Sequence, residues 1–151
     1  MVKEIVKDRE ELQNKCKTIF DKEKIAEIVK DLKDSAIYYA DQNNNPDGCA
    51  GLAANQIGYN DRIIICNIQR FLRNPPEWLI MINPTIVKYS RDTHVSIEGC
   101  LSLEGKREVL RYDSIIVLYT NEHGKTVKER FVGFNATVIQ HEIDHLCGKL
   151  I

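Results

Sequence analysis

The chain has 151 residues, of which 43% are hydrophobic and 28% charged, and its formal net charge is -1 at pH 7. This length is enough for one domain with a substantial core and too short for two ordinary ones, so residues 1–151 are expected to form a single domain. Because Lys and Arg are interspersed with Asp and Glu, no basic stripe follows a phosphate backbone, which argues against a direct nucleic-acid site.

The N-terminus and the cysteines favour a soluble, cytoplasmic protein. No apolar run approaches the roughly 20 residues that span a bilayer, and the first residues alternate in charge where a signal peptide has its apolar core. The five cysteines include no CxxC pair. Without a secretion signal, an odd number of scattered cysteines indicates reduced thiols instead of a disulfide framework, and no membrane partner is expected.

The first predicted element is an amphipathic helix of about 20 residues. Asp21 is placed to cap it, and apolar residues recur at three- and four-residue spacing from Ile25 to Ala40, with Ile37 on the same stripe. Residues 42–48 (QNNNPDG) then form a cluster of turn formers, which we expect to be an exposed loop.

Short β-branched and aromatic runs follow, each bounded by turn residues. They predict strands at residues 62–68, 79–82, 85–89, 114–119 and 125–132, with a hairpin turn at 121–124. Asn83 and Pro84 indicate an edge or a bend, because proline cannot donate to a ladder.

A second helix is predicted from about residue 135 to Cys147, where Gly148 offers the left-handed residue that commonly ends helices. The order of elements therefore predicts an α+β fold with an N-terminal helix, a mostly antiparallel sheet region and a C-terminal helix that binds metal.

The second helix carries the most informative motif of the chain, residues 140–146 (QHEIDHL). His141 and His145 lie one helical turn apart, so their ring nitrogens can converge on one metal ion. Glu142 lies beside them and can accept a proton from metal-bound water. A hydrolytic metal site of this kind needs one more protein ligand.

Cys100 is the strongest candidate for the third ligand. It lies in residues 97–102 (IEGCLS), where Gly99 permits a close backbone approach and Glu98 can orient a neighbouring ligand. The alternative for any cysteine is a buried thiol without metal. Of the other histidines, His123 falls in the predicted hairpin turn and His94 in a stretch that we expect to be exposed.

Phe134 and Val138 share one stripe of the second helix with His141 and His145. This predicts an apolar pocket beside the metal. The alternative is that both residues anchor the helix on the sheet, and the two roles are compatible.

Three segments in this order resemble the three characteristic motifs of peptide deformylases: residues 51–58 (GLAANQIG), 98–102 (EGCLS) and 140–146 (QHEIDHL). The resemblance covers about residues 48–151. It implies the family's α+β fold, a divalent metal held by Cys100, His141 and His145, and removal of the formyl group from N-formyl-methionyl peptides. The metal implied is Fe(II), with Zn(II) or Ni(II) as alternatives. The ribosome exit region is a further partner that this family suggests.

The resemblance also assigns roles in catalysis. A hydroxide on the metal would attack the formyl carbon, with Glu142 acting as base and then as acid. The Gln56 side-chain amide and the Leu101 backbone N–H would stabilise the oxygen of the tetrahedral intermediate. Ala50 and Gly51 would pair with the peptide as an added strand, and methionine would enter the apolar pocket.

The family pattern also suggests supporting residues, and this sequence differs from the pattern at one position of the first motif. Arg111 is expected to pair with Glu98, although a surface position is the default for an arginine. Asp144 is expected to support the site. The family's first glycine in the first motif is Cys49 here, where a side chain would narrow the substrate groove or bring a second thiol near the metal.

Other classes of protein remain as alternatives. A zincin-like peptidase would usually take its third ligand downstream, and only six residues follow His145. A non-enzymatic deformylase-like metal-binding module would be expected to lose Glu142 or Gln56, and both are present. A structural zinc site would need four protein ligands, of which Cys49 could supply the last.

Overall fold

The computed structural model describes residues 1–42, 49–68 and 77–151. The expected loop at 42–48 therefore lies, apart from residue 42, outside the described residues. The elements in chain order are α1 (Arg9–Leu12), α2 (Lys22–Gln42), β1 (Gly51–Ala53), the 3-10 helix η1 (Ala54–Ile57), β2 (Ile63–Ile68), β3 (Glu77–Tyr89), β4 (Thr93–Cys100), β5 (Leu103–Tyr112), β6 (Ser114–Thr120), β7 (Thr126–Val132) and α3 (Gly133–Leu146).

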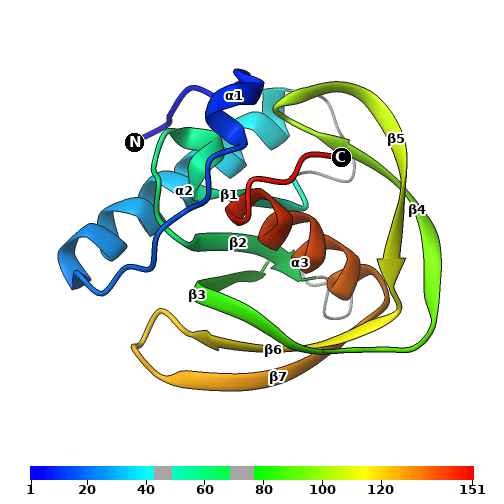
Figure 1. Ribbon diagram of the computed structural model, residues 1–151. Coiled ribbons are helices and arrows are strands. Elements are labelled where there is room, and N and C mark those ends of the chain that lie inside the picture. The colour runs from blue at the N-terminus through cyan, green and yellow to red at the C-terminus, as the bar shows by residue number, and fades with distance from the viewer. Residues whose placement is uncertain (43–48, 69–76) are drawn as a thin grey trace.

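The strands form two antiparallel sheets. Five of them make one sheet in the order β1-β2-β3-β6-β7, and β4 pairs with β5 in a second sheet. Figure 1 shows α3 lying between the larger sheet and the long, curved β4–β5 pair, with α2 on the other side of β1 and β2. The predicted α+β fold is confirmed.

Strand β2 explains why a helix covers each face of the larger sheet. Its apolar run has no polar face, and successive side chains point to opposite sides of a strand. Ile63 and Ile65 pack with the apolar stripe of α2, whereas Ile64 and Cys66 pack with the apolar residues of α3. An apolar cluster therefore lies on each face of β2, and the one that contains Ile64 and Cys66 holds α3 against the sheet.

Helix α2 forms close to where its pattern predicts. The Asp21 carboxylate accepts hydrogen bonds from the backbone N–H groups of Glu23 and Lys24, at 3.1 and 3.2 Å, and so caps the helix as expected. Ile37 differs from the prediction, because half of its side chain is exposed.

The strand predictions need two corrections. The runs at 79–82 and 85–89 belong to a single strand, β3, which bends where the ladder changes register after Ile82 and where Asn83 takes a φ of +51°. The residue pattern also predicts no strand at β4 or β5, although these two form a long hairpin.

Helix α3 starts at Gly133, two residues earlier than predicted, and Gly148 adopts the expected left-handed conformation just beyond it, with a φ of +77°. Residues near the N-terminus pack against that end, because the Cys16 N–H donates to the Leu146 carbonyl at 2.9 Å. None of the helices in the described part of the chain has the length and apolar character of a membrane span.

Candidate metal centre

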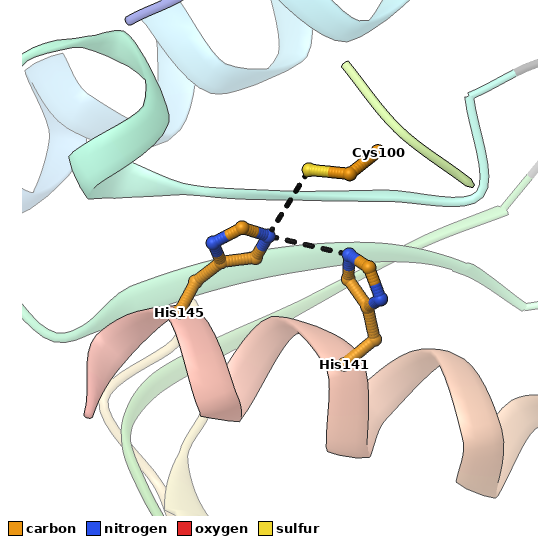
Figure 2. Close-up of side chains that lie close together, drawn as sticks. All are labelled: Cys100, His141 and His145. Atoms are coloured by element: carbon orange, nitrogen blue, oxygen red, sulfur yellow. Dashed lines mark hydrogen bonds between the residues drawn. The ribbon is translucent and has the colours of Figure 1, made fainter. Parts of the chain in front are cut away.

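The two histidines of α3 and the thiol at the end of β4 converge on one point. Figure 2 shows their side chains facing one another. The Nε2 atoms of His141 and His145 are 3.2 Å apart, and Cys100 Sγ lies 3.4 Å from His145 Nε2. One donor atom from each residue lies within 4.8 Å of the other two. Residues that are about 40 positions apart in the sequence thus form one three-donor group.

These spacings suit a tetrahedral metal ion. Bonds of about 2.0–2.1 Å to nitrogen and about 2.3 Å to sulfur give tetrahedral edges of roughly 3.3 Å between nitrogens and 3.6 Å between nitrogen and sulfur. The distances in the structure are close to both values. A thiolate with two imidazoles is also a donor set that zinc and iron accept. The three side chains therefore fit a divalent cation, with a fourth position left for water or substrate.

Glu98 and Arg111 hold His141 in the orientation that a ligand needs. His141 Nδ1 lies 2.8 Å from Glu98 Oε1, so in a neutral ring the proton sits on Nδ1 and the Nε2 lone pair faces the metal position. Arg111 donates two hydrogen bonds to the Glu98 carboxylate, at 2.8 and 2.6 Å, and one to Asp144 at 2.6 Å. Both the expected Arg111–Glu98 pair and the supporting contact of Asp144 are present.

The neighbouring Arg111 and His141 side chains keep Glu98 ionised. Burial alone would raise the pKa of Glu98, but hydrogen bonds from Arg111 and His141 outweigh burial and lower it to about 2. Burial likewise opposes the charged form of His141, yet hydrogen bonds to Cys100 and Glu98 raise the pKa of that ring to about 10. Binding of a divalent cation to these side chains would release protons from them.

His145 stays neutral. Burial, together with the positive charges of His141 and Arg111, lowers the pKa of its ring to about 3. Its backbone carbonyl accepts a hydrogen bond from the Asn55 side chain at 2.8 Å, which ties η1 to the end of α3. Among the described residues, His145 Nδ1 is buried without a hydrogen-bond partner.

The Gln56 side chain lies against the thiol of Cys100. Its Oε1 accepts from the Ala53 N–H at 3.0 Å, which fixes the orientation of the amide. Its Nε2 donates to Cys100 Sγ at 3.4 Å and to Ser102 Oγ at 3.2 Å. The motif around η1 and the motif around Cys100 therefore meet at an amide N–H beside the metal position.

Glu142 is a buried carboxylate with an unsatisfied oxygen. Its side chain is 4% exposed, and Oε2 has no hydrogen-bond partner within the described residues. Burial, only partly opposed by the charges of His141 and Arg111, raises the pKa of Glu142 to about 7. Gly51 leaves room for this side chain, because a Cβ added to Gly51 would lie 2.9 Å from Glu142 Cγ.

A cavity of about 990 Å³ opens beside the metal position. Its walls come from the segment around β1, from β4 and the turn after it, and from α3, and they include Gln56, Leu101 and Glu142. The remaining residues predicted to bind substrate also line it: Ala50, Gly51, Phe134 and Val138. Val138 is also part of the apolar core, so its two predicted roles coexist.

The other candidate ligands lie apart from the three-donor group. His94 belongs to β4, in a stretch where Thr93 and Val95 are exposed as expected, and its Nδ1 lies 2.6 Å from Asp113 Oδ1. His123 lies in the predicted turn, where its N–H donates to Asn121. Cys49 lines the cavity but is not a member of the group, which argues against a closed structural zinc site. Asn55 and Ser102 are supporting residues that sequence reasoning missed, because their partners come from distant segments.

The site combines a histidine pair on one helix with a thiol from another segment, and it leaves one coordination position open. A buried carboxylate faces the cavity beside it. This arrangement is that of a metal-dependent hydrolase. Comparison with known proteins gives the particular family. The Polypeptide deformylase family profile matches residues 2–151. The chain therefore belongs to the polypeptide deformylase family, and its activity is the metal-dependent removal of N-formyl groups.

Relatives and solved structures agree with this assignment. The chain is 35% identical to a peptide deformylase of Clostridium beijerinckii over the full length of both, and 36% identical to peptide deformylase 3 of Shewanella oneidensis over 93% of this chain and 80% of that one. A probable peptide deformylase from Synechococcus phage S-SSM7 superposes with a TM-score of 0.82 at 36% identity, covering 99% of this chain and 95% of the other. The Met-Ala-Ser-bound class I type b peptide deformylase of Acinetobacter baumannii superposes with a TM-score of 0.84 at 26% identity, covering 99% and 97%. These matches leave no basis for the zincin-like and non-enzymatic alternatives.

Proposed function

We propose that the cavity binds the N-terminus of an N-formyl-methionyl peptide in an extended conformation. Ala50 and Gly51 lie at β1, an edge strand to which a peptide can add as a further strand. Phe134 and Val138 form the apolar wall that receives the methionine side chain. The Acinetobacter baumannii relative has been solved with Met-Ala-Ser bound, a peptide that begins with methionine, which supports this class of substrate.

The carboxylate of Glu142 is the proposed proton carrier. A bound divalent cation supplies polarisation of a water molecule and lowers its pKa toward neutrality. Glu142 takes the proton of the attacking water and then delivers it to the departing amine nitrogen of methionine. The observation that carries this role is the unsatisfied, buried oxygen of Glu142 beside the three-donor group.

Two donors are proposed to stabilise the negative charge that develops on the formyl oxygen. The Gln56 amide is held beside Cys100 by its contacts to Ala53 and Ser102, so it needs little reorganisation during the reaction. The backbone N–H of Leu101 is the second donor, and Leu101 lines the same cavity.

The substitution Glu142→Gln tests the mechanism. Because an amide cannot accept the water proton, formate release from formyl-Met-Ala-Ser should fall by about 10²–10⁴-fold. Cys100, His141 and His145 are intact in this variant, so its metal content should equal that of the parent. The matched control is Glu108→Gln on the exposed face of β5, which should keep full activity. Unchanged turnover in Glu142→Gln would rule out the proposed proton carrier.

The native metal is proposed to be Fe(II), with Zn(II) or Ni(II) able to occupy the same donors. Metal analysis after anaerobic purification, with activity measured on the same sample, tests this choice. Full activity in a preparation that contains zinc and no iron would contradict it. Since the substrate is a newly made polypeptide, the cytoplasm and the ribosome exit region remain the expected location and partner.

A further inference from the structure

Cys49 lies at the open edge of the larger sheet. It lies two residues before the start of β1 at Gly51, and the one strand neighbour of β1 among the described residues is β2. The Ala50 carbonyl accepts a hydrogen bond from the Asn67 N–H at 2.8 Å, so Ala50 faces β2. Since carbonyls alternate in direction along an antiparallel strand, the carbonyl of Gly51 points away from β2 and toward the open edge.

The outward carbonyl of Gly51 already has a donor. Cys49 Sγ lies 3.2 Å from the Gly51 carbonyl oxygen. The Cys49 side chain is buried, and burial keeps its thiol protonated at neutral pH by raising the pKa to about 12. The thiol therefore donates to an acceptor that an added peptide strand would also use.

An independent observation shows that this edge faces a ligand site. A Cβ atom added to Gly51 would lie 2.9 Å from Glu142 Cγ, so the glycine faces this side chain. Glu142 is more than nine-tenths buried, and its Oε2 lacks a hydrogen-bond partner within the described part of the chain. Cys49, Gly51 and Glu142 line the same cavity. The Cys49–Gly51 contact is thus part of the wall along which the substrate backbone is proposed to lie.

We propose that the Cys49 thiol competes with the substrate for the Gly51 carbonyl and so tunes substrate affinity. In the free enzyme the thiol satisfies the carbonyl. A backbone N–H of the formylated peptide displaces the thiol on binding, which leaves a buried donor without its acceptor and weakens binding. This inference rests on the proposed strand-like binding of the peptide at Gly51.

Two variants separate hydrogen bonding from shape. Cys49→Ala removes the donor but keeps the Cβ atom, whereas Cys49→Ser keeps a donor on a side chain of similar size. Because one competing hydrogen bond disappears, Cys49→Ala should lower KM for formyl-Met-Ala-Ser by about two- to tenfold, with kcat within twofold of the parent. The inhibition constant of the peptide Met-Ala-Ser should fall by the same factor. Cys49→Ser should keep a KM equal to or above that of the parent.

The outcomes distinguish this inference from the proposed function. If the parent enzyme releases no formate from formyl-Met-Ala-Ser, the proposed function itself fails. If the parent is active but Cys49→Ala and Cys49→Ser have the same KM, only the proposed competition between thiol and substrate is overturned. Cys49→Gly also removes the donor and should match Cys49→Ala. If only Cys49→Gly lowers KM, the competition is overturned, and steric crowding by the Cβ atom of residue 49 explains the effect instead.

Discussion

The two buried glutamates of the site show how neighbours assign different chemistry to one residue type. Glu98 receives hydrogen bonds from Arg111 and His141, which hold its pKa at about 2 despite burial. Among the described residues Glu142 Oε2 has no hydrogen-bond partner, and burial raises the pKa of Glu142 to about 7. Glu98 is therefore ionised at neutral pH and orients the His141 ring, whereas Glu142 can exchange a proton near neutral pH.

Cys100→Ser should reduce metal binding. A hydroxyl is a poor replacement for a thiolate toward a soft or borderline metal, so bound metal per chain should fall well below one equivalent. Metal analysis after dialysis against a weak chelator measures the effect. Cys147→Ser is the matched control, because Cys147 is a free thiol outside the three-donor group and should leave metal content unchanged. Full metal occupancy in Cys100→Ser would show that the thiol is not a ligand.

The ligands themselves could be predicted because their spacing is local. His141, Glu142 and His145 lie within one and a half turns of a helix, and Cys100 stands out through its sequence neighbours. The burial of Arg111, unlike the ligands, could not be predicted from local spacing. Its side chain is 4% exposed because Glu98 and Asp144 meet it from β4 and α3, and such long-range pairing leaves no periodic pattern in the sequence.

The hairpin of β4 and β5 escaped prediction for a physical reason. Along β4 the apolar residues Val95 and Ile97 are 62% and 70% exposed, while Glu98 is buried against the metal site. The usual strand pattern places apolar residues inward, so this alternation is reversed. A strand that faces a polar site carries its polar residues on the covered side, and the ordinary pattern then gives no signal.

The ion pairs that join this hairpin to α3 predict a loss of both stability and metal. In Arg111→Met the buried Glu98 carboxylate would lose its guanidinium partner, which typically costs about 3–5 kcal/mol. His141 would also lose its fixed orientation. Urea unfolding should therefore show a lower free energy of unfolding, and metal analysis should show a lower occupancy.

The exposed Arg130 of β7 offers a matched control. Surface substitutions usually change stability by no more than about 0.5 kcal/mol, so Arg130→Met should keep both stability and metal content. A loss in Arg111→Met no larger than in Arg130→Met would show that the buried ion pairs do not support the site.

The N-terminal segment connects parts of the molecule that are distant in sequence. The N–H of Val6 donates to the Gln56 carbonyl at 2.8 Å, and the N–H of Cys16 donates to the Leu146 carbonyl at 2.9 Å. The segment thus contacts both η1 and the end of α3. Its sequence has no motif for this role, since backbone hydrogen bonds of irregular segments place few demands on residue type.

Gly148 tests this contact. A Cβ atom at Gly148 would lie 2.2 Å from the Gln13 carbonyl oxygen, and a φ of +77° adds strain for an L residue. Gly148→Ala should therefore destabilise the protein by about 2 kcal/mol or more, which corresponds to a Tm lower by roughly 4–8 °C. Calorimetry of the metal-loaded protein measures the shift.

Gly58→Ala is the control for backbone strain alone. Gly58 has a φ of +89°, and no atom lies within 4 Å of its added Cβ. Its expected penalty is about 1 kcal/mol, from the left-handed conformation only. Equal losses in the two variants would mean that the Gln13 contact adds nothing to stability.

Asn55 and Gln56 are adjacent in η1, yet they serve two different parts of the reaction centre. Asn55 holds the His145 carbonyl, and Gln56 contacts the Cys100 sulfur. A shift of this single turn would move both supports together. Metal binding and catalytic turnover therefore depend on the same turn. Substitutions in residues 54–57 are expected to change both together.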